Sequence, residues 1–260
     1  MLLVEKKEGV ARVTLNRPEV RNAFDDALIK VLHEAFVSLG KDPSVRAVIL
    51  AGNGPAFCAG ADLNWMKRMA GYSYEQNLAD ARALADMLAT LDRMPIPTIA
   101  RVHGPAFAGG TGLVAACDIA VGTPQATFCF SEAKLGLSPA TISPHVMRAI
   151  GERAARRYFL TAEVFDAAEA ERIGLLTLVV EKELLDKSIE DLLGHLLAGG
   201  PEAHKNIKAL VREVSGRPVD DALVALTAKR IAEIRVSPEG REGIASFLEK
   251  RKAAWCSKKS

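Results

Sequence analysis

The stretch FAGGTGL at residues 107–113 has the composition of a turn in which backbone groups can bind an anion. A run that reads as a buried strand, residues 97–102, leads into this turn, and a small apolar helix over residues 113–117 follows it. The first N–H groups of a helix have no partner within the helix, and glycine lets a ligand approach them closely. We therefore expect the turn to bind an anion, or an oxygen that becomes anionic during a reaction.

A second turn of the same character lies in FCAGADL at residues 57–63. It also has small residues, follows an apolar strand over residues 48–51, and precedes a predicted helix. Two such turns in one domain suggest that two backbone donors point at one oxygen atom. That arrangement stabilises the negative charge of an oxyanion.

Glycine-rich turns also occur in other kinds of site. GTGLVA at 110–115 matches the dinucleotide fingerprint, but residues 104–108 separate it from the strand end where that fingerprint must lie. GLSPA at 136–140 nearly matches the nucleophile elbow of serine hydrolases, but Pro139 follows the serine and has no N–H to donate. Close packing of a helix on a strand also explains residues 108–112, and these residues alone leave that alternative open.

Composition excludes several classes of protein. The 260 residues are 49% hydrophobic and 25% charged, which is typical of a soluble globular protein with a sizeable core. The net charge of +2 favours neither nucleic acid nor a membrane as a partner. Residues 1–10 do not resemble a signal peptide, and no apolar run reaches transmembrane length. The cysteines are scattered and the histidines lack metal-ligand spacing, so we expect a cytoplasmic protein with reduced thiols and no metal.

The elements that must position the two turns alternate in type up to about residue 180. Apolar periodicity predicts strands over residues 10–15, 46–51, 97–102, 119–121, 126–130 and 176–180. It predicts helices over residues 24–39, 78–91 and 166–173, with Gly40 ending the first, and a further helix with Ser143 as its N-cap. From Lys182 to Lys250 only helical periodicity remains, which predicts an α/β body with an all-helical tail.

Six motifs then occur in a fixed order along nearly the whole chain. They are NRP with RNAF at 16–24, AFCAGADL at 56–63, GPAFAGG at 104–110, ACDI at 116–119, FSEAKLGL at 130–137 and FLEKRK at 247–252. In these motifs the chain resembles the crotonase superfamily, the enoyl-CoA hydratase/isomerase enzymes. The resemblance implies an α/β spiral of ββα units over residues 1–195, which carries the active site. It also implies a helical trimerisation region over residues 196–260, and a homo-oligomer that is either a trimer or a homohexamer formed as a dimer of trimers.

The resemblance assigns roles to particular residues. Ala61 and Gly109 take the two oxyanion-hole positions, whose backbone N–H groups would bind the thioester carbonyl of an acyl-CoA. The positions that line the CoA nucleotide and pantetheine path correspond here to Arg21, Ala23, Asp62 and Leu63. Phe247 and Lys250 match positions that reach the CoA of a neighbouring subunit, although a solvated helix charge explains Lys250 equally well. Asp62 also suits a second polar group near the thioester, although its place before a helix favours a backbone cap. CoA is then part of the substrate, and no separate cofactor is expected.

The expected acid/base groups depart from the two-glutamate pattern of hydratases. The first glutamate position, three residues after Gly109, is Gly112, whereas the second matches Glu132. The N–H that helps to hold the water in hydratases would come from Ala140. A single carboxylate can move one proton between two carbons, or can take a proton from water and return it to Cα. Glycine at position 112 is expected to enlarge the substrate pocket and to remove a charge from it.

These assignments lead to an expected function. We expect an enoyl-CoA hydratase, with an enoyl-CoA isomerase as the alternative and a CoA hydrolase or decarboxylase of the same fold as a third possibility. Residues 131–145 are similar to a bacterial branch assigned to enoyl-CoA or methylglutaconyl-CoA hydration in leucine degradation. RNA binding, known for some relatives, is a different class of function. No arginine-rich or aromatic-interleaved patch in the sequence supports it.

Overall fold

The computed structural model describes residues 1–256 and separates them into two compact units. The first unit is Met1–Leu192, and the second begins at Leu193. The first unit contains all nine strands of the described residues, together with helices α1 to α6, whereas the second is built from helices alone. Helix α7 (Leu185–Ala198) runs across the division between the units.

A six-stranded sheet forms the centre of the first unit, in the order β1-β2-β3-β4-β6-β9. Its strands are β1 (Leu2–Lys7), β2 (Val10–Leu15), β3 (Ala47–Gly52), β4 (Thr98–Val102), β6 (Ile119–Gly122) and β9 (Leu178–Val179). Only β1 pairs in the antiparallel direction, and the other neighbours are parallel. All six residues of β3 are buried, as its continuous apolar run predicts for a central parallel strand. The sequence did not reveal β1, because this edge strand exposes five of its six residues and lacks an apolar pattern.

A smaller sheet has the order β5-β7-β8. Strand β5 (Ala106–Phe107) pairs in parallel with β7 (Thr127–Cys129), and β8 (Phe165–Asp166) joins β7 in the antiparallel direction. These strands are two or three residues long, and a two-residue run carries no periodicity. The sequence therefore predicted β7 but neither β5 nor β8.

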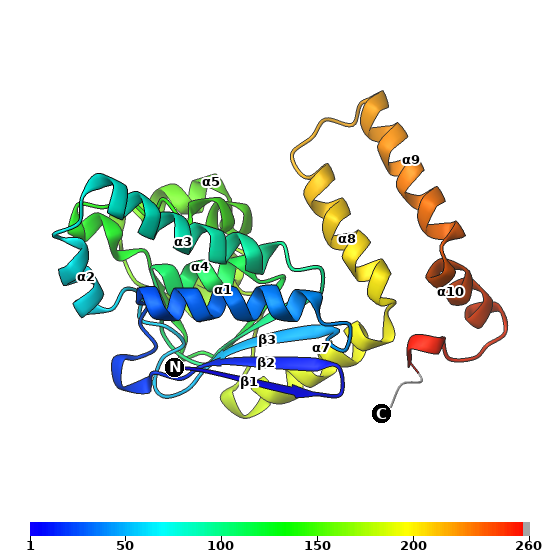
Figure 1. The fold of residues 1–260 in the computed structure, drawn as a ribbon, viewed down its shortest axis with the longest axis horizontal. Coiled ribbons are helices and arrows are strands. Elements are labelled where there is room, and N and C mark those ends of the chain that lie inside the picture. The colour runs from blue at the N-terminus through cyan, green and yellow to red at the C-terminus, as the bar shows by residue number, and fades with distance from the viewer. Residues whose placement is uncertain (257–260) are drawn as a thin grey trace. The chain divides into compact units, whose positions relative to one another are not determined.

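The helices of the first unit begin and end close to the predicted positions. They are α1 (Asp26–Lys41), α2 (Leu63–Met69), α3 (Tyr74–Asp92), α4 (Gly109–Ala116), α5 (Ser143–Thr161) and α6 (Ala167–Arg172). Helices α1 and α3 pack together over one face of the six-stranded sheet (Figure 1). Asp25 begins α1 because its carboxylate accepts a hydrogen bond from the Leu28 N–H, 2.7 Å away.

Several helix boundaries differ from the prediction, and α3 begins at Tyr74 rather than at residue 78. Helix α1 continues through Gly40 to Lys41, so Gly40 does not end it. Helix α4 begins at Gly109 rather than at Leu113, so the glycine-rich turn is itself the first turn of the helix. The N-cap of α5 is Ile142, and Ser143 is already helical, because its hydroxyl donates to the carbonyl of Ala140 and does not cap the helix.

The second unit is helical throughout its described length. Helices α8 (Pro201–Val214), α9 (Asp221–Val236) and α10 (Pro238–Leu248) follow α7, and they are separated at the predicted glycine, serine and proline positions. Large apolar side chains are exposed along these helices, namely Ile207, Val211, Val224, Ile231, Val236, Ile244, Phe247 and Leu248. Within residues 1–256, no helix combines the length and the apolar character needed to cross a bilayer.

Candidate functional site

Three segments of the first unit lie side by side in parallel: the one that contains Cys58, strand β5 and strand β7. Each is followed by a residue that was predicted to belong to the site. Cys58 pairs with Ala106, and Phe107 pairs with Cys129, all in the parallel direction. Hydrogen bonds from the Phe107 N–H to the Cys58 carbonyl (2.9 Å) and from the Ala108 N–H to the Cys129 carbonyl (2.8 Å) complete the row. The segments therefore end at a common edge, where parallel sheets bind ligands. The segments leaving this edge carry Ala61, Gly109 and Glu132.

Gly109 is the first residue of α4, and Ala108 is its N-cap, with a positive φ of 47°. The Gly109 N–H donates to no protein group among residues 1–256. It is one of the donors that a helix start leaves unpaired, and the helix dipole adds a favourable field for negative charge. Glycine is required nearby, because a Cβ on Gly110 would lie 2.8 Å from the Cβ of Cys58.

Ala61 lies on the neighbouring loop with its N–H also unused. Phe24 donates to the Gly60 carbonyl (2.6 Å) and accepts from the Asp62 N–H (2.7 Å), so the Ala61 N–H points away from Phe24. Within the described part of the chain, that N–H has no acceptor. The loop of Ala61 also touches the loop of Gly109, because a Cβ on Gly60 would lie 3.3 Å from the Cβ of Ala108.

Asp62 fixes the loop of Ala61 to the rest of the fold. Its carboxylate accepts from the Asn64 N–H (2.8 Å) and the Trp65 N–H (3.3 Å), which caps α2, and it forms an ion pair with Arg17 at 3.1 Å. Burial opposes ionisation of Asp62, but these donors more than offset it and hold its pKa below the ordinary value. The capping role predicted for Asp62 is confirmed. Arg17, which also pairs with Asp25 at 2.9 Å, was not singled out from the sequence.

Glu132 lies in a short 3₁₀ helix, Ser131–Leu135, directly after Phe130. Phe130 is fully buried and packs edge-on against Phe159, with the ring centroids 4.8 Å apart, which anchors the start of this helix. One carboxylate oxygen of Glu132, Oε2, is buried and has no hydrogen-bond partner among residues 1–256. Burial raises the pKa of Glu132 above its ordinary value. A half-buried carboxylate that has one buried, unpaired oxygen and a raised pKa is a candidate acid/base group.

Two expectations about this site are corrected by the structure. Gly112 is buried, but a Cβ on it would lie 2.9 Å from the Cβ of Ile142 and closer still to its Cγ2. Ile142 therefore fills the space that glycine was expected to open. The N–H of Ala140 donates to the Ser138 carbonyl at 2.8 Å, so it is not a free donor for a water molecule. No pattern in the sequence relates Ile142 to Gly112, which lies 30 residues earlier.

The residues expected along the CoA path are distributed over both units. Arg21 is exposed, with φ of 52°, Ala23 is buried, and Leu63 is 73% exposed on the first turn of α2. These residues neighbour the Ala61 loop, since the Arg21 carbonyl accepts from the Ala59 N–H at 3.0 Å. Phe247 and Lys250 belong to the second unit and are both exposed. Their contact with CoA stays a prediction.

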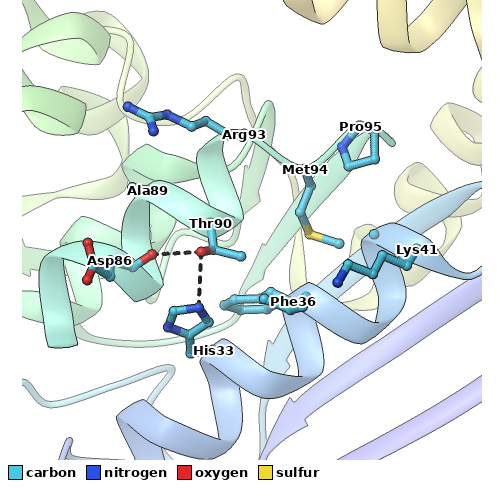
Figure 2. Close-up of a pocket in the computed structure, with 11 residues that line it drawn as sticks. His33, Phe36, Lys41, Asp86, Ala89, Thr90, Arg93, Met94 and Pro95 are labelled. Carbon is cyan, nitrogen blue, oxygen red and sulfur yellow. Dashed lines mark hydrogen bonds between the residues drawn. The ribbon is translucent and has the colours of Figure 1, made fainter.

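A separate cavity of about 420 Å³ lies between α1 and the C-terminal end of α3. Its lining includes Phe36, Met94 and Pro95, and His33 faces Thr90 across 3.5 Å between Nε2 and Oγ1 (Figure 2). None of the residues predicted for the site lines this cavity.

Burial raises the pKa of Cys58 to about 12, so this thiol, which packs beside Gly110, is neutral and is not a nucleophile.

Comparison with known proteins finds relatives of one family that match nearly the whole chain. The family model described as "Enoyl-CoA hydratase/isomerase" matches residues 5–258. The chain is 36% identical over 251 residues to a Thermus thermophilus protein named "Putative enoyl-CoA hydratase", covering 96% of this chain and 98% of that one. It is 30% identical over 259 residues to the crotonyl-CoA hydratase of Syntrophomonas wolfei, covering 99% and 98%. The crystal structure of an enoyl-CoA hydratase from Shewanella pealeana superposes with a TM-score of 0.96 at 42% identity, covering 98% and 95% of the two chains.

Proposed function

We propose that this chain, which belongs to the enoyl-CoA hydratase/isomerase family, is an enoyl-CoA hydratase that adds water across the α,β double bond of a thioester. One observation carries the proposal. Two backbone N–H groups, those of Ala61 and Gly109, have no protein acceptor among residues 1–256. They are carried by two touching loops at the edge where Glu132, with its unpaired oxygen Oε2, also lies.

In the proposed hydration, the two N–H groups stabilise the enolate and Glu132 transfers the proton. The thioester oxygen accepts from the N–H groups of Ala61 and Gly109, which stabilise the negative charge that it gains as the enolate forms. Glu132 takes a proton from water while the water oxygen bonds to Cβ, and the electrons of the double bond move to the thioester oxygen. The enolate then collapses as Cα takes the proton back from Glu132. The raised pKa of Glu132 suits this role, because the group must both accept and return a proton.

Isomerisation of an enoyl-CoA is the second candidate, and a specific observation favours it. Ile142 fills the space beside Gly112, and the Ala140 N–H is already used within the protein. The site therefore has neither a second carboxylate at position 112 nor a free N–H at Ala140 to hold water. With Glu132 as the single acid/base group, a proton can be taken from one carbon and returned to another without water.

The acyl chain is proposed from the sequence alone. Residues 131–145 resemble the branch assigned to methylglutaconyl-CoA hydration in leucine degradation, so a branched acyl chain bearing a carboxylate is the first substrate to test. The space beside Gly112 does not add support for this acyl chain, because Ile142 fills it. A homo-oligomer, a trimer or a dimer of trimers, is proposed from the resemblance and from the exposed apolar side chains of the second unit.

Incubation with a panel of enoyl-CoA esters tests the proposal. The panel should contain linear 2-enoyl, linear 3-enoyl and methylglutaconyl esters, with products separated and weighed by mass spectrometry. A mass gain of one water identifies a hydratase, whereas an unchanged mass with a shifted double bond identifies an isomerase. No turnover of any ester by the folded protein would overturn both functions.

A further inference from the structure

We infer that Phe24 is a positioning residue that sets the separation of the two N–H donors, holding one through its backbone and the other through its ring. The inference rests on the proposed function, since it concerns the donors of Ala61 and Gly109. The sequence does not mark Phe24 for this role, because it reads as the first apolar residue of the helix predicted over residues 24–39. In the structure it precedes α1 and its N-cap, Asp25.

The backbone of Phe24 holds the loop on both sides of Ala61. It pairs with Ala61 as a parallel bridge, donating to the carbonyl of the residue before it and accepting from the N–H of the residue after it. The two hydrogen bonds are 2.6 and 2.7 Å long. This pairing fixes the peptide plane that carries the Ala61 N–H, and any residue except proline at position 24 would preserve it.

The ring of Phe24 packs against the other donor. Phe24 is only 1% exposed, and a Cβ on Gly109 would lie 2.9 Å from ring atom Cε2 and 3.0 Å from Cδ2. The ring edge therefore occupies the space that a side chain on Gly109 would need. The start of α4 cannot move toward the ring without displacing it, and it loses packing if it moves away.

The spacing matters because an oxyanion hole works only when both donors lie about 2.7–3.1 Å from the position of the charged oxygen. A displacement of about 1 Å in a catalytic group costs about 100-fold in rate. One residue that contacts both donor segments couples their positions directly. Its backbone role and its ring role can also be separated, since shortening the side chain leaves both hydrogen bonds in place.

The test compares Phe24→Leu with Phe36→Leu. Phe36 is a matched control, because it is also fully buried in the first unit but lines the separate cavity between α1 and α3. Initial rates are measured with the enoyl-CoA ester that the wild type turns over fastest, at a temperature well below the melting point of each variant. We expect Phe24→Leu to lower kcat by roughly 10-fold or more with little change in KM. Phe36→Leu should change both parameters by less than about twofold, since a core defect away from the site acts on stability.

A double-mutant cycle provides the second measurement. Gly109→Ala keeps the N–H but pushes a methyl group against the ring edge, so it should also slow turnover. If the ring sets the spacing, the double variant Phe24→Leu/Gly109→Ala should be faster than the product of the two single effects predicts, because the shorter side chain makes room for the methyl group.

The outcomes separate this inference from the proposed function. Equal kcat in Phe24→Leu and Phe36→Leu, or effects of Phe24→Leu and Gly109→Ala that simply multiply, would overturn the role of Phe24 while leaving the function intact. A wild-type protein that turns over no thioester would overturn the proposed function, and this inference with it. If Phe24→Leu fails to fold, Phe24→Met replaces it with a side chain that fills irregular space.

Discussion

Ile142 occupies the space into which a side chain at position 112 would have to project. The ideal Cβ of a residue at Gly112 would lie 2.9 Å from the Cβ of Ile142, and Leu88 closes the same space at 3.7 Å. Ile142 is 1% exposed and forms the N-cap of α5, so it cannot move aside without disturbing the start of that helix. This contact between α4 and α5 therefore excludes a second carboxylate at position 112.

Gly112→Glu should destabilise the fold rather than add a working acid. Overpacking a core costs about 1–3 kcal/mol, and the buried charge adds to this cost. The midpoint of urea unfolding checks the result, with Gly194→Glu as the control, because a Cβ at Gly194 would meet no atom within 4 Å. Gly112→Glu/Ile142→Ala should recover part of the loss. An unchanged midpoint in Gly112→Glu alone would show that Ile142 does not fill this space.

Arg17→Lys should destabilise the Ala61 loop, because one ammonium group cannot bind Asp25, Asp62 and the Ala23 carbonyl as the guanidinium does. Loss of one such charged hydrogen bond is expected to cost about 2 kcal/mol. Because the folded-state pKa of Asp62 lies below its ordinary value of 3.8, its stabilisation is present above that pH and is lost as pH falls through the lowered pKa. The melting temperature of Arg17→Lys should therefore lie below that of wild type at pH 7, and the difference should be smaller at about pH 3.

Arg156→Lys is the control for Arg17→Lys. The ion pair of Arg156 with Glu152 joins side chains that are 70% and 66% exposed, and such pairs contribute little. Equal effects of the two substitutions on the melting temperature at pH 7 would contradict the role given to Arg17.

The carboxylate of Glu132 should make the wild type less stable at neutral pH than the Glu132→Gln variant. Burial raises its folded-state pKa above the ordinary 4.5, so ionisation in the folded state costs free energy as pH rises through the raised pKa. Below 4.5 the carboxyl is protonated in both states and this cost disappears. Glu132→Gln should therefore melt at a higher temperature than wild type at pH 8, with the difference vanishing near pH 4. The exposed Glu183→Gln is the control. A difference that grows toward acid pH would refute the raised pKa.

Gly109→Pro removes one N–H, and Gly109→Ala separates this loss from steric effects. Both substitutions place a Cβ against the ring of Phe24, but only proline lacks the donor. Proline is tolerated at the first position of a helix, so α4 should still form. Loss of one oxyanion donor costs about 10²–10³-fold in kcat, and this is the expected difference between the two variants. Equal kcat in the two folded variants would mean that the Gly109 N–H does not stabilise the transition state.

The sequence was sufficient to predict strands, caps and turns that depend on residues close together in the chain. The central parallel strands follow from continuous apolar runs, and Asp62 caps α2 as its place before the helix suggests. The glycine-rich turn before α4 was also predicted, although the helix begins at Gly109 and not at Leu113. The sequence identified Glu132 but could not show that its Oε2 is buried and unpaired, because burial depends on how the short 3₁₀ helix Ser131–Leu135 packs behind Phe130.

Features that depend on distant contacts could not be predicted. Ile142 meets Gly112, and Phe24 meets Gly109, across helices and loops that are far apart in the chain. The hydrogen bond from the Ala140 N–H to the Ser138 carbonyl joins residues close in sequence, but it depends on a turn that no residue pattern in GLSPA specifies. Strands β5 and β8 have two residues each, too few to show periodicity, yet β5 places Gly109 beside the segment that leads to Glu132.

The activity of Glu132→Gln tests the central claim most directly. Glutamine keeps the shape of the side chain but cannot accept and return a proton, so kcat on the best enoyl-CoA ester should fall by about 10²–10⁴-fold, toward the upper end for a single group making both transfers. Calorimetric affinity for a saturated acyl-CoA should stay close to that of wild type, because the proposed oxyanion donors are backbone groups of Ala61 and Gly109. Circular dichroism establishes that the variant is folded. Wild-type turnover by the folded Glu132→Gln protein would contradict the single-carboxylate mechanism and the assignment of this site.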